Sequence, residues 1–161
     1  MVSLVPRRVL ILSAGVAAVA AIFTGTARSA SLTRSEASLL RVMNQVRGAH
    51  GLRPLWFDPR LERASRRHST RMLQTQTFFH GNFVARIRGV GVRAPRVGEN
   101  LAWAAGPLSA AQAIVNLWLA SPEHRANLLR AGYRTVGVGA RRGTFDGYPG
   151  ALMVTTDFAG R

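Results

Sequence analysis

The change of hydrophobic periodicity along the chain limits its fold more than any other feature. Over residues 33–76 apolar side chains recur at helical spacing, whereas residues 133–158 contain two apolar runs of strand character, the first alternating with a period of two. We expect these runs to pair as a hairpin joined across residues 141–150. Helices first, strands last and a mixed centre predict an α+β domain in which helices cover a sheet.

Local signals mark where the first two helices begin. Thr33 and Glu36 have the spacing of a capping box, in which each side chain bonds the backbone N–H of the other residue, and Gly51 ends this helix. Asp58 precedes Pro59, and an acidic N-cap followed by proline is a second start signal. Both helices are expected to form scaffold.

The centre, residues 98–129, concentrates the groups that carry chemistry. It opens with a short apolar run over residues 100–105, which is typical of a buried strand. Ser109 with Gln112 then has the form of a capping box and predicts a helix that must end before Pro122.

A carboxylate and a histidine of this centre are the first candidates for a site. Ser121 can cap a second, short helix with Pro122 in its first position, which puts His124 in the first turn. The partial positive charge at a helix start favours the neutral imidazole, the form that binds a metal or acts as a base. Glu99 stands at the entrance to the preceding strand, so the fold can bring it to His124.

The first 30 residues have the layout of a secretory signal peptide. Two arginines precede an apolar run over residues 9–23, which is followed by small residues, so cleavage is expected after Ala27 or Ala30. A retained membrane anchor is the alternative, although the run is short for a span. The chain contains no cysteine, so an exported domain would depend on packing or a bound metal instead of disulfides.

The charge of the chain favours anionic partners. All 22 basic residues are arginines against seven acidic residues, and the formal charge of +15 falls to +12 when cleavage after Ala30 removes Arg7, Arg8 and Arg28. We expect attraction to an anionic envelope polymer or lipid, and not to nucleic acid, because no binding motif accompanies the charge. One side of the second helix forms either a solvated face or a polyanion-binding stripe of four arginines: Arg60, Arg63, Arg67 and Arg71.

The three histidines outside the centre receive different interpretations. His50 lies in the last turn of the first helix, where the dipole favours a cation, and is interpreted as a cap. His68 falls on the apolar side of the second helix, which is typical of a buried, hydrogen-bonded histidine. His80 follows two aromatic residues where the chain enters a loop, and a loop histidine positioned by such packing is a site candidate.

Short motifs follow one another in order over about residues 36–159: Asn44-Gln-Val-Arg47, Gly51-Leu52, Pro54-Leu55, Asp58-Pro-Arg-Leu61, His68-Ser69 with Met72, Phe79-His80, Gly98-Glu-Asn-Leu101, Trp118 with Ser121-Pro122, His124-Arg-Ala-Asn-Leu128, Gly137-Val-Gly139 and Thr156-Asp-Phe158. The ordered set resembles the bacterial branch of the CAP family (cysteine-rich secretory proteins, antigen 5 and pathogenesis-related 1), also called the SCP domain. The resemblance implies a three-layer α-β-α sandwich over residues 34–161 and a secreted or extracytoplasmic protein, which we expect to be a monomer.

The resemblance also implies a cleft lined by two histidines and two glutamates, which hold a divalent cation in several members. The matching positions are His80, Glu99 and His124, a set suited to zinc. The second glutamate does not carry over, because Trp118-Leu-Ala-Ser121 has serine where the family has that acid. Glu123 is a candidate substitute, although bacterial members usually have glycine at that position.

Two functions remain open. One is a binding module for a lipid or cell-envelope ligand, which we favour; the other is a metal-dependent hydrolase of envelope glycan or peptide, with the metal on His80, Glu99 and His124. Whether the protein is an enzyme stays undecided, since hydrolysis needs a carboxylate free of the metal and only Glu123 remains for that role. A serine hydrolase is not indicated, because the chain has no Gly-x-Ser-x-Gly motif.

Export can be tested at the N-terminus of the mature protein. The chain should begin at Arg28 or Ser31, because these residues follow the two candidate cleavage sites. N-terminal sequencing of protein recovered from outside the cytoplasm identifies the first residue directly. A full-length chain held in the membrane would instead show an anchored domain.

Overall fold

A computed structural model describes residues 31–161, and the predicted signal peptide lies outside these residues. The elements in chain order are α1 (Arg34–Ala49), β1 (Trp56–Phe57), α2 (Pro59–Thr75), α3 (Phe83–Gly89), β2 (Arg96–Ala104), the 3-10 turn η1 (Gly106–Ser109), α4 (Ala111–Ala120), α5 (Pro122–Leu128), β3 (Tyr133–Phe145) and β4 (Tyr148–Gly160).

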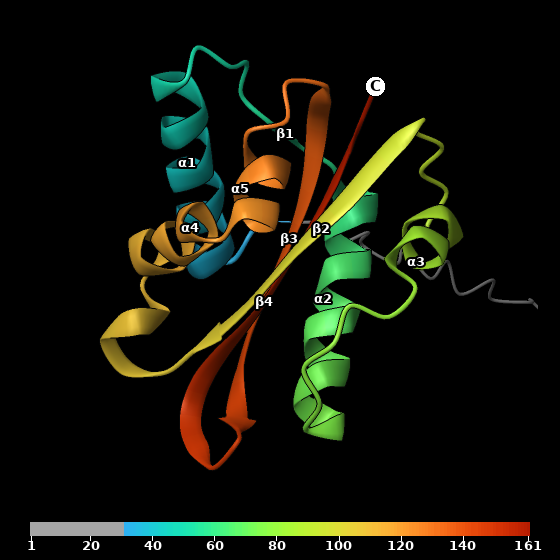
Figure 1. Ribbon diagram of the computed structural model, residues 1–161. Helices are drawn as coiled ribbons and strands as arrows, with labels where there is room; N and C mark the ends of the chain where they lie inside the picture. The colour runs from blue at the N-terminus through green and yellow to red at the C-terminus, as the bar shows by residue number, and fades with distance from the viewer. Residues whose placement is uncertain (1–30) are drawn as a thin grey trace, which may run out of the picture.

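The four strands form one mixed sheet in the order β1-β3-β4-β2. β1 runs parallel to β3, while β4 is antiparallel to both β3 and β2. Helices α1, α4 and α5 lie on one side of the sheet, and α2 and α3 lie on the other (Figure 1). This confirms the predicted α+β class and three-layer α-β-α sandwich. Within residues 31–161, no helix is both long and apolar enough to cross a membrane.

Both predicted helix starts in the first half are confirmed. The Thr33 N–H donates to Glu36 Oε2 at 2.8 Å, and the Glu36 N–H donates to the Thr33 hydroxyl at 3.3 Å. Asp58 accepts from the Arg60 N–H at 2.8 Å, with Pro59 in the first helical position. Each side chain satisfies an N–H group that the helix leaves unpaired, which fixes where α1 and α2 begin.

The capping box predicted at Ser109 and Gln112 is wrong. Residues 106–109 form η1, and the Ser109 hydroxyl donates to the Gly106 carbonyl at 2.7 Å. Helix α4 begins after Ala110 and has no side-chain cap. The Ser109 hydroxyl therefore serves the preceding turn, one residue too early to cap α4.

The two C-terminal strands are longer than predicted. Most of the expected connection over residues 141–150 is strand, since β3 continues to Phe145 and β4 begins at Tyr148. The turn consists of Asp146 and Gly147, with φ of 49° and 77°. Positive φ at both positions of a two-residue turn matches the twist of the paired strands, and Asp-Gly is a favoured sequence for it.

The main core lies between the sheet and the layer of α1, α4 and α5. Trp118 of α4 is buried there, and its Nε1–H donates to the Leu101 carbonyl of β2 at 2.8 Å. Arg47 of α1 is also fully buried, and its guanidinium donates to the carbonyls of Leu128 at 2.7 Å and Arg130 at 3.1 Å. Because these polar groups find acceptors, they can be buried without leaving unpaired donors, and they tie the helices to the sheet.

Helix α2 packs on the opposite face of the sheet at very short range. A Cβ atom added to either Gly137 or Gly139 of β3 would overlap backbone atoms of α2. The Ser65 hydroxyl donates to the Gly137 carbonyl at 3.1 Å, and the Ser69 hydroxyl donates to the Gly139 carbonyl at 2.8 Å. Two glycines that face two serines therefore set how closely α2 approaches the sheet.

Gly139→Ala should lower the free energy of unfolding by about 2 kcal/mol or more, because the new methyl group forces α2 away from β3. Gly143→Ala on the same strand is the matched control, since its Cβ would meet only the Leu73 side chain, at 3.2 Å, which can shift. Chemical denaturation of both variants measures the difference. Equal stability of the two variants would contradict the close packing of α2.

Candidate binding cleft

Four predicted site residues line a single cleft. It has a volume of about 740 Å³ and is bordered by β2, α3 and α5. His80 reaches it from the loop before α3, Glu99 from β2, and Glu123 and His124 from the first turn of α5. The fold thus brings these four residues into one cleft.

Glu99 is the buried member of this wall, with 3% of its surface exposed. Its Oε1 lies 2.8 Å from His80 Nδ1, and its Oε2 accepts from the Arg86 guanidinium. Its backbone carbonyl accepts from Asn127 Nδ2 at 3.1 Å, which joins β2 to α5. Both carboxylate oxygens are therefore engaged by donors of the protein itself.

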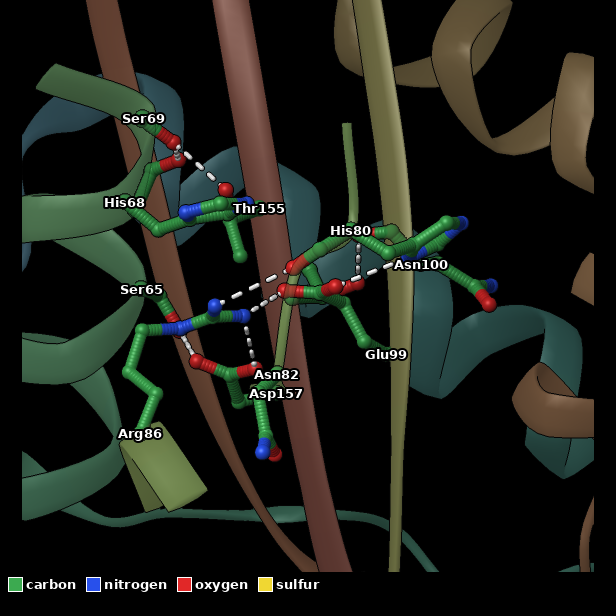
Figure 2. Close-up of polar contacts among 12 residues, drawn as sticks. Ser65, His68, Ser69, His80, Asn82, Arg86, Glu99, Asn100, Thr155 and Asp157 are labelled. Carbon is green, nitrogen blue, oxygen red and sulfur yellow. Dashed lines mark hydrogen bonds and ion pairs between the residues drawn. The ribbon is translucent and has the colours of Figure 1, made fainter. Parts of the chain in front are cut away.

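Arg86 of α3 links Glu99 to a second buried acid. Asp157 of β4 lies opposite Glu99 in the antiparallel β2–β4 register, and its Oδ1 is 3.4 Å from the Arg86 guanidinium (Figure 2). Ser65 of α2 donates to the other oxygen of Asp157 at 2.8 Å. Like charges on paired strand positions repel each other, so the guanidinium between them is what allows both acids to be buried.

The buried charge cluster, defined as Arg86, Glu99 and Asp157, holds one cation for two acids. Burial raises the pKa of Glu99 and the nearby Asp157 raises it further, whereas Arg86 opposes the shift. Burial also raises the pKa of Asp157, against the lowering effects of Arg86 and Ser65. The cluster therefore favours the uptake of a proton by one of its two carboxyl groups.

His80 and His124 line the cleft as neutral rings. Burial lowers the pKa of both imidazoles, and for His80 the neighbouring His124 and Arg86 lower it further. His80 uses Nδ1 for its bond to Glu99, and His124 Nδ1 lies 2.9 Å from Ser121 Oγ. Since each ring uses Nδ1 for a protein partner, Nε2 is the atom left for a ligand.

Ser121 precedes α5 as predicted, with Pro122 in the first helical position, but its side chain does not cap the helix. Its hydroxyl bonds the His124 ring instead. The serine that stands in place of an acid therefore has a definite task, because it fixes the orientation of His124.

The cleft does not present a complete set of zinc ligands in this arrangement. Within residues 31–161, no three His, Asp or Glu side chains lie close enough to share one ion. Zinc sites in proteins take three or four protein donors, and both oxygens of Glu99 are already engaged. Zinc held by His80, Glu99 and His124 stays a prediction, and it would require these three side chains to move closer together.

His50 and His68 lie outside the cleft and have the structural roles that the sequence predicts. His50 is the C-cap of α1, with Nδ1 2.9 Å from the Val46 carbonyl. His68 is 3% exposed, and its Nε2 lies 2.8 Å from the Phe79 carbonyl. Burial, together with the positive charge of Arg86, lowers the pKa of His68 to about 4, so the ring stays neutral at physiological pH.

Arg86 and Asp157 are absent from the predicted site. Arg86 is one of four arginines within residues 82–97, and no local pattern distinguishes it from the others. The usable signal is Asp157, an acid near the end of an otherwise apolar strand. A buried carboxylate needs a cation or donors, and that requirement points to an unidentified partner.

The remaining wall of the cleft is part cationic and part apolar. Its cationic members are Arg88, Arg96 and Arg130, and its apolar members include Phe83, Val84 and Val97. The ion pairs found within residues 31–161 do not involve these three arginines. Such a wall suits a ligand that combines an anionic group with an apolar part.

Comparisons with known proteins agree on one family. A family model described as CAP, cysteine-rich secretory protein family, matches residues 40–158. The chain is 28% identical over 121 residues to YkwD, an uncharacterized protein of Bacillus subtilis, and 33% identical over 117 residues to YlbC, an uncharacterized membrane protein of the same species. These matches cover 72% and 68% of this chain but 46% and 32% of the relatives, so the chain spans less than half the length of either.

Solved structures show the same fold. An extracellular protein containing an SCP domain from Bacillus anthracis matches with a TM-score of 0.67 at 25% identity, covering 83% of this chain and 45% of that one. An outer surface protein from Borrelia burgdorferi matches with a TM-score of 0.69 at 21% identity, covering 81% of this chain and 96% of that one.

Arg86→Gln should lower the free energy of unfolding by about 3 to 5 kcal/mol at neutral pH, because it leaves two buried acids without their cation. The folded pKa values of Glu99 and Asp157 lie above their ordinary values, so the penalty for ionising them grows as pH rises and is absent below about pH 4. The loss in the variant should therefore shrink as pH falls. Denaturation of both proteins at acid and neutral pH measures it.

The control for this prediction is Arg88→Gln, which changes an exposed arginine of the same helix. It should alter the free energy of unfolding by less than about 0.5 kcal/mol at either pH. A loss in Arg86→Gln that is the same at acid and neutral pH would contradict ionised carboxylates as its cause.

Proposed function

The chain belongs to the CAP family of cysteine-rich secretory proteins, and we propose that it is an exported binding module whose cleft takes an anionic lipid of the cell envelope. The observation that carries the proposal is the composition of the cleft of about 740 Å³, where guanidinium groups and neutral imidazoles adjoin apolar side chains. Such a mixture matches an amphiphile better than a purely polar ligand.

An anionic lipid has a charged head group that suits the arginines of this wall and an acyl chain that suits its apolar residues. The Arg88 and Arg96 guanidinium groups can donate paired hydrogen bonds to phosphate or carboxylate oxygens. Apolar residues such as Phe83 and Val97 can cover the first carbons of an acyl chain, which gains free energy by leaving water. Because Arg86 compensates the charge of Glu99, Glu123 is the acid of the wall that opposes an anionic ligand.

Export is supported by the sequence and by the similar proteins. The first 30 residues have the layout of a secretion signal, and the two solved structures belong to an extracellular protein and an outer surface protein. An envelope lipid is therefore an available partner. The formal charge of +12 after cleavage would also hold the protein near an anionic surface.

The contacts of Glu99 are the reason for placing binding ahead of catalysis. A general base must be unprotonated, whereas burial and the neighbouring Asp157 raise the pKa of Glu99 to about 9, and both of its oxygens already have partners in His80 and Arg86. A hydrolase of this type would use a metal ion, and within residues 31–161 no three side chains converge as ligands for one.

A hydrolase acting on envelope glycan or peptide is the second candidate, and one observation favours it. His80 is held through Nδ1 by a carboxylate, as a general base is held in many hydrolases. Its lowered pKa keeps the ring neutral at neutral pH, and in the tautomer that donates from Nδ1 to Glu99 the Nε2 atom can accept a proton. Glu123 and His124 share the same cleft wall and are further candidates for catalytic groups.

Lipid binding can be tested with lysophosphatidylglycerol, a single-chain anionic lipid, and with zwitterionic lysophosphatidylcholine, both kept monomeric. Calorimetry should show binding of the anionic lipid that weakens roughly ten-fold or more in Arg88→Gln/Arg96→Gln, because charge-assisted hydrogen bonds are lost. The control is Arg41→Gln/Arg53→Gln, which removes the same charge from exposed arginines outside the cleft wall.

The control should lower affinity by no more than about two-fold. Equal losses in the two double variants, or no binding by the wild type, would contradict the cleft as a lipid site. Cleavage of envelope glycan or peptide by the wild type, abolished by His80→Ala, would favour the hydrolase instead.

A further inference from the structure

A second pocket lies beside the cleft and shares no lining residue with it. Its volume is about 390 Å³, and it is bordered by α2, α3 and the loop between them. That loop contributes to both sites, since His80 lines the cleft while Phe79 and Asn82 line the second pocket. The second pocket therefore has walls of its own.

Three arginines converge on the second pocket, and no acid lines it. Arg67 and Arg71 come from α2 and Arg86 from α3. Arg67 and Arg71 are one turn apart, a spacing at which like charges destabilise a helix, and neither forms an ion pair within residues 31–161. The two guanidinium groups repel each other, and a bound anion would offset this repulsion.

The side chains around these arginines give the pocket a defined shape. The Arg71 guanidinium lies over the Phe79 ring, 5.9 Å from its centroid, and such stacking restricts its orientation. The Phe79 carbonyl is in turn fixed by His68 Nε2 at 2.8 Å. At Arg86 the Nε–H is a buried donor with no hydrogen-bond partner among residues 31–161. The pocket thus combines two accessible guanidinium groups with a third arginine that retains an unpaired buried N–H.

The electrostatic state of His68 agrees with a positive potential at this place. After burial, the charge of Arg86 is the next cause that lowers the pKa of the ring to about 4, and Arg71 contributes in the same direction. A neutral His68 adds no charge of its own, and Asn82 offers an amide that can donate.

We propose that this second pocket is an oxyanion site that takes a phosphoryl group between Arg67 and Arg71 of α2. A guanidinium presents its donors as a planar fork that matches two oxygens of a phosphate, and two forks can engage a tetrahedral group from two sides. The phosphoryl group belongs either to a soluble phosphate ester or to a lipid head group. A carboxylate has only two oxygens and satisfies this arrangement less well.

The test uses the mature protein with inorganic phosphate and glycerol 3-phosphate, each titrated at fixed ionic strength, and with acetate as a planar anion. The wild type should bind both phosphates at least about ten-fold more tightly than acetate. Arg67→Gln/Arg71→Gln should weaken phosphate binding by about ten-fold or more. Arg41→Gln/Arg53→Gln carries the same net charge and should stay within about two-fold of the wild type.

The two sources of the phosphoryl group are separated by vesicles of phosphatidylcholine with and without phosphatidic acid. Binding of soluble phosphates supports a soluble ester, and binding of vesicles that depends on both phosphatidic acid and Arg67 and Arg71 supports a lipid head group. Absence of both kinds of binding overturns the proposal. Equal losses in the two double variants, or equal affinities for phosphate and acetate, overturn it as well.

The cleft variant Arg88→Gln/Arg96→Gln distinguishes this proposal from the proposed function. If phosphate binds in the second pocket, this variant loses lysophosphatidylglycerol while its phosphate affinity stays within about two-fold of the wild type. Loss of phosphate binding in the cleft variant, with none in Arg67→Gln/Arg71→Gln, would place the phosphate in the cleft and overturn the second site.

Discussion

Helix α2 can lie directly against β3 because two glycines of that strand leave room for the helix backbone. This close approach brings Ser65 to Asp157, where its hydroxyl donates to the carboxylate beneath Arg86. Arg86 holds Glu99, and Glu99 holds His80 at the edge of the cleft. The position of His80 therefore depends on the contact between α2 and β3, whose glycines and serines do not line the cleft. Because the chain has no cysteine, these packed and hydrogen-bonded groups, and no disulfide, hold the cleft residue in place.

The direction in which the acids point decides what the cleft offers to a ligand. Glu99 and Asp157 turn toward Arg86, so their charges are used inside the protein, where burial would otherwise be very costly. The polar groups that remain at the surface of the cleft include the guanidinium groups of three arginines, the two imidazoles and the carboxylate of Glu123. Arg67 and Arg71 of α2 likewise have no ion-pair partner within residues 31–161, so both the cleft and the second pocket favour negative groups.

Features governed by short-range chemistry could be predicted from the sequence, and features governed by distant contacts could not. The caps at Thr33 and Asp58 depend on residues within one helical turn, and the structure confirms them. The box at Ser109 has the same pattern but fails, because α4 begins one residue later, with Ala110 at its N-cap. The places of Glu99 and His124 at a strand entrance and a helix start predict that the two can meet, whereas only the resemblance places His80 with them. Arg86 carries no such mark, since its role exists only once α3 has packed beside β2 and β4.

Arg47 has a consequence for how the protein opens. This buried guanidinium of α1 donates to carbonyls just before β3, on a segment whose residues Arg130 and Tyr133 also border the cleft. If α1 detached, those carbonyls would lose their hydrogen-bond donor. If the segment detached, the buried Arg47 guanidinium would lose its acceptors. Either opening alone therefore has a high free-energy cost. The first helix and the far border of the cleft should therefore exchange their amide hydrogens as one cooperative unit, with matching protection. A ligand bound in the cleft would then also raise the hydrogen-exchange protection of α1, which lies far from the cleft residues in sequence.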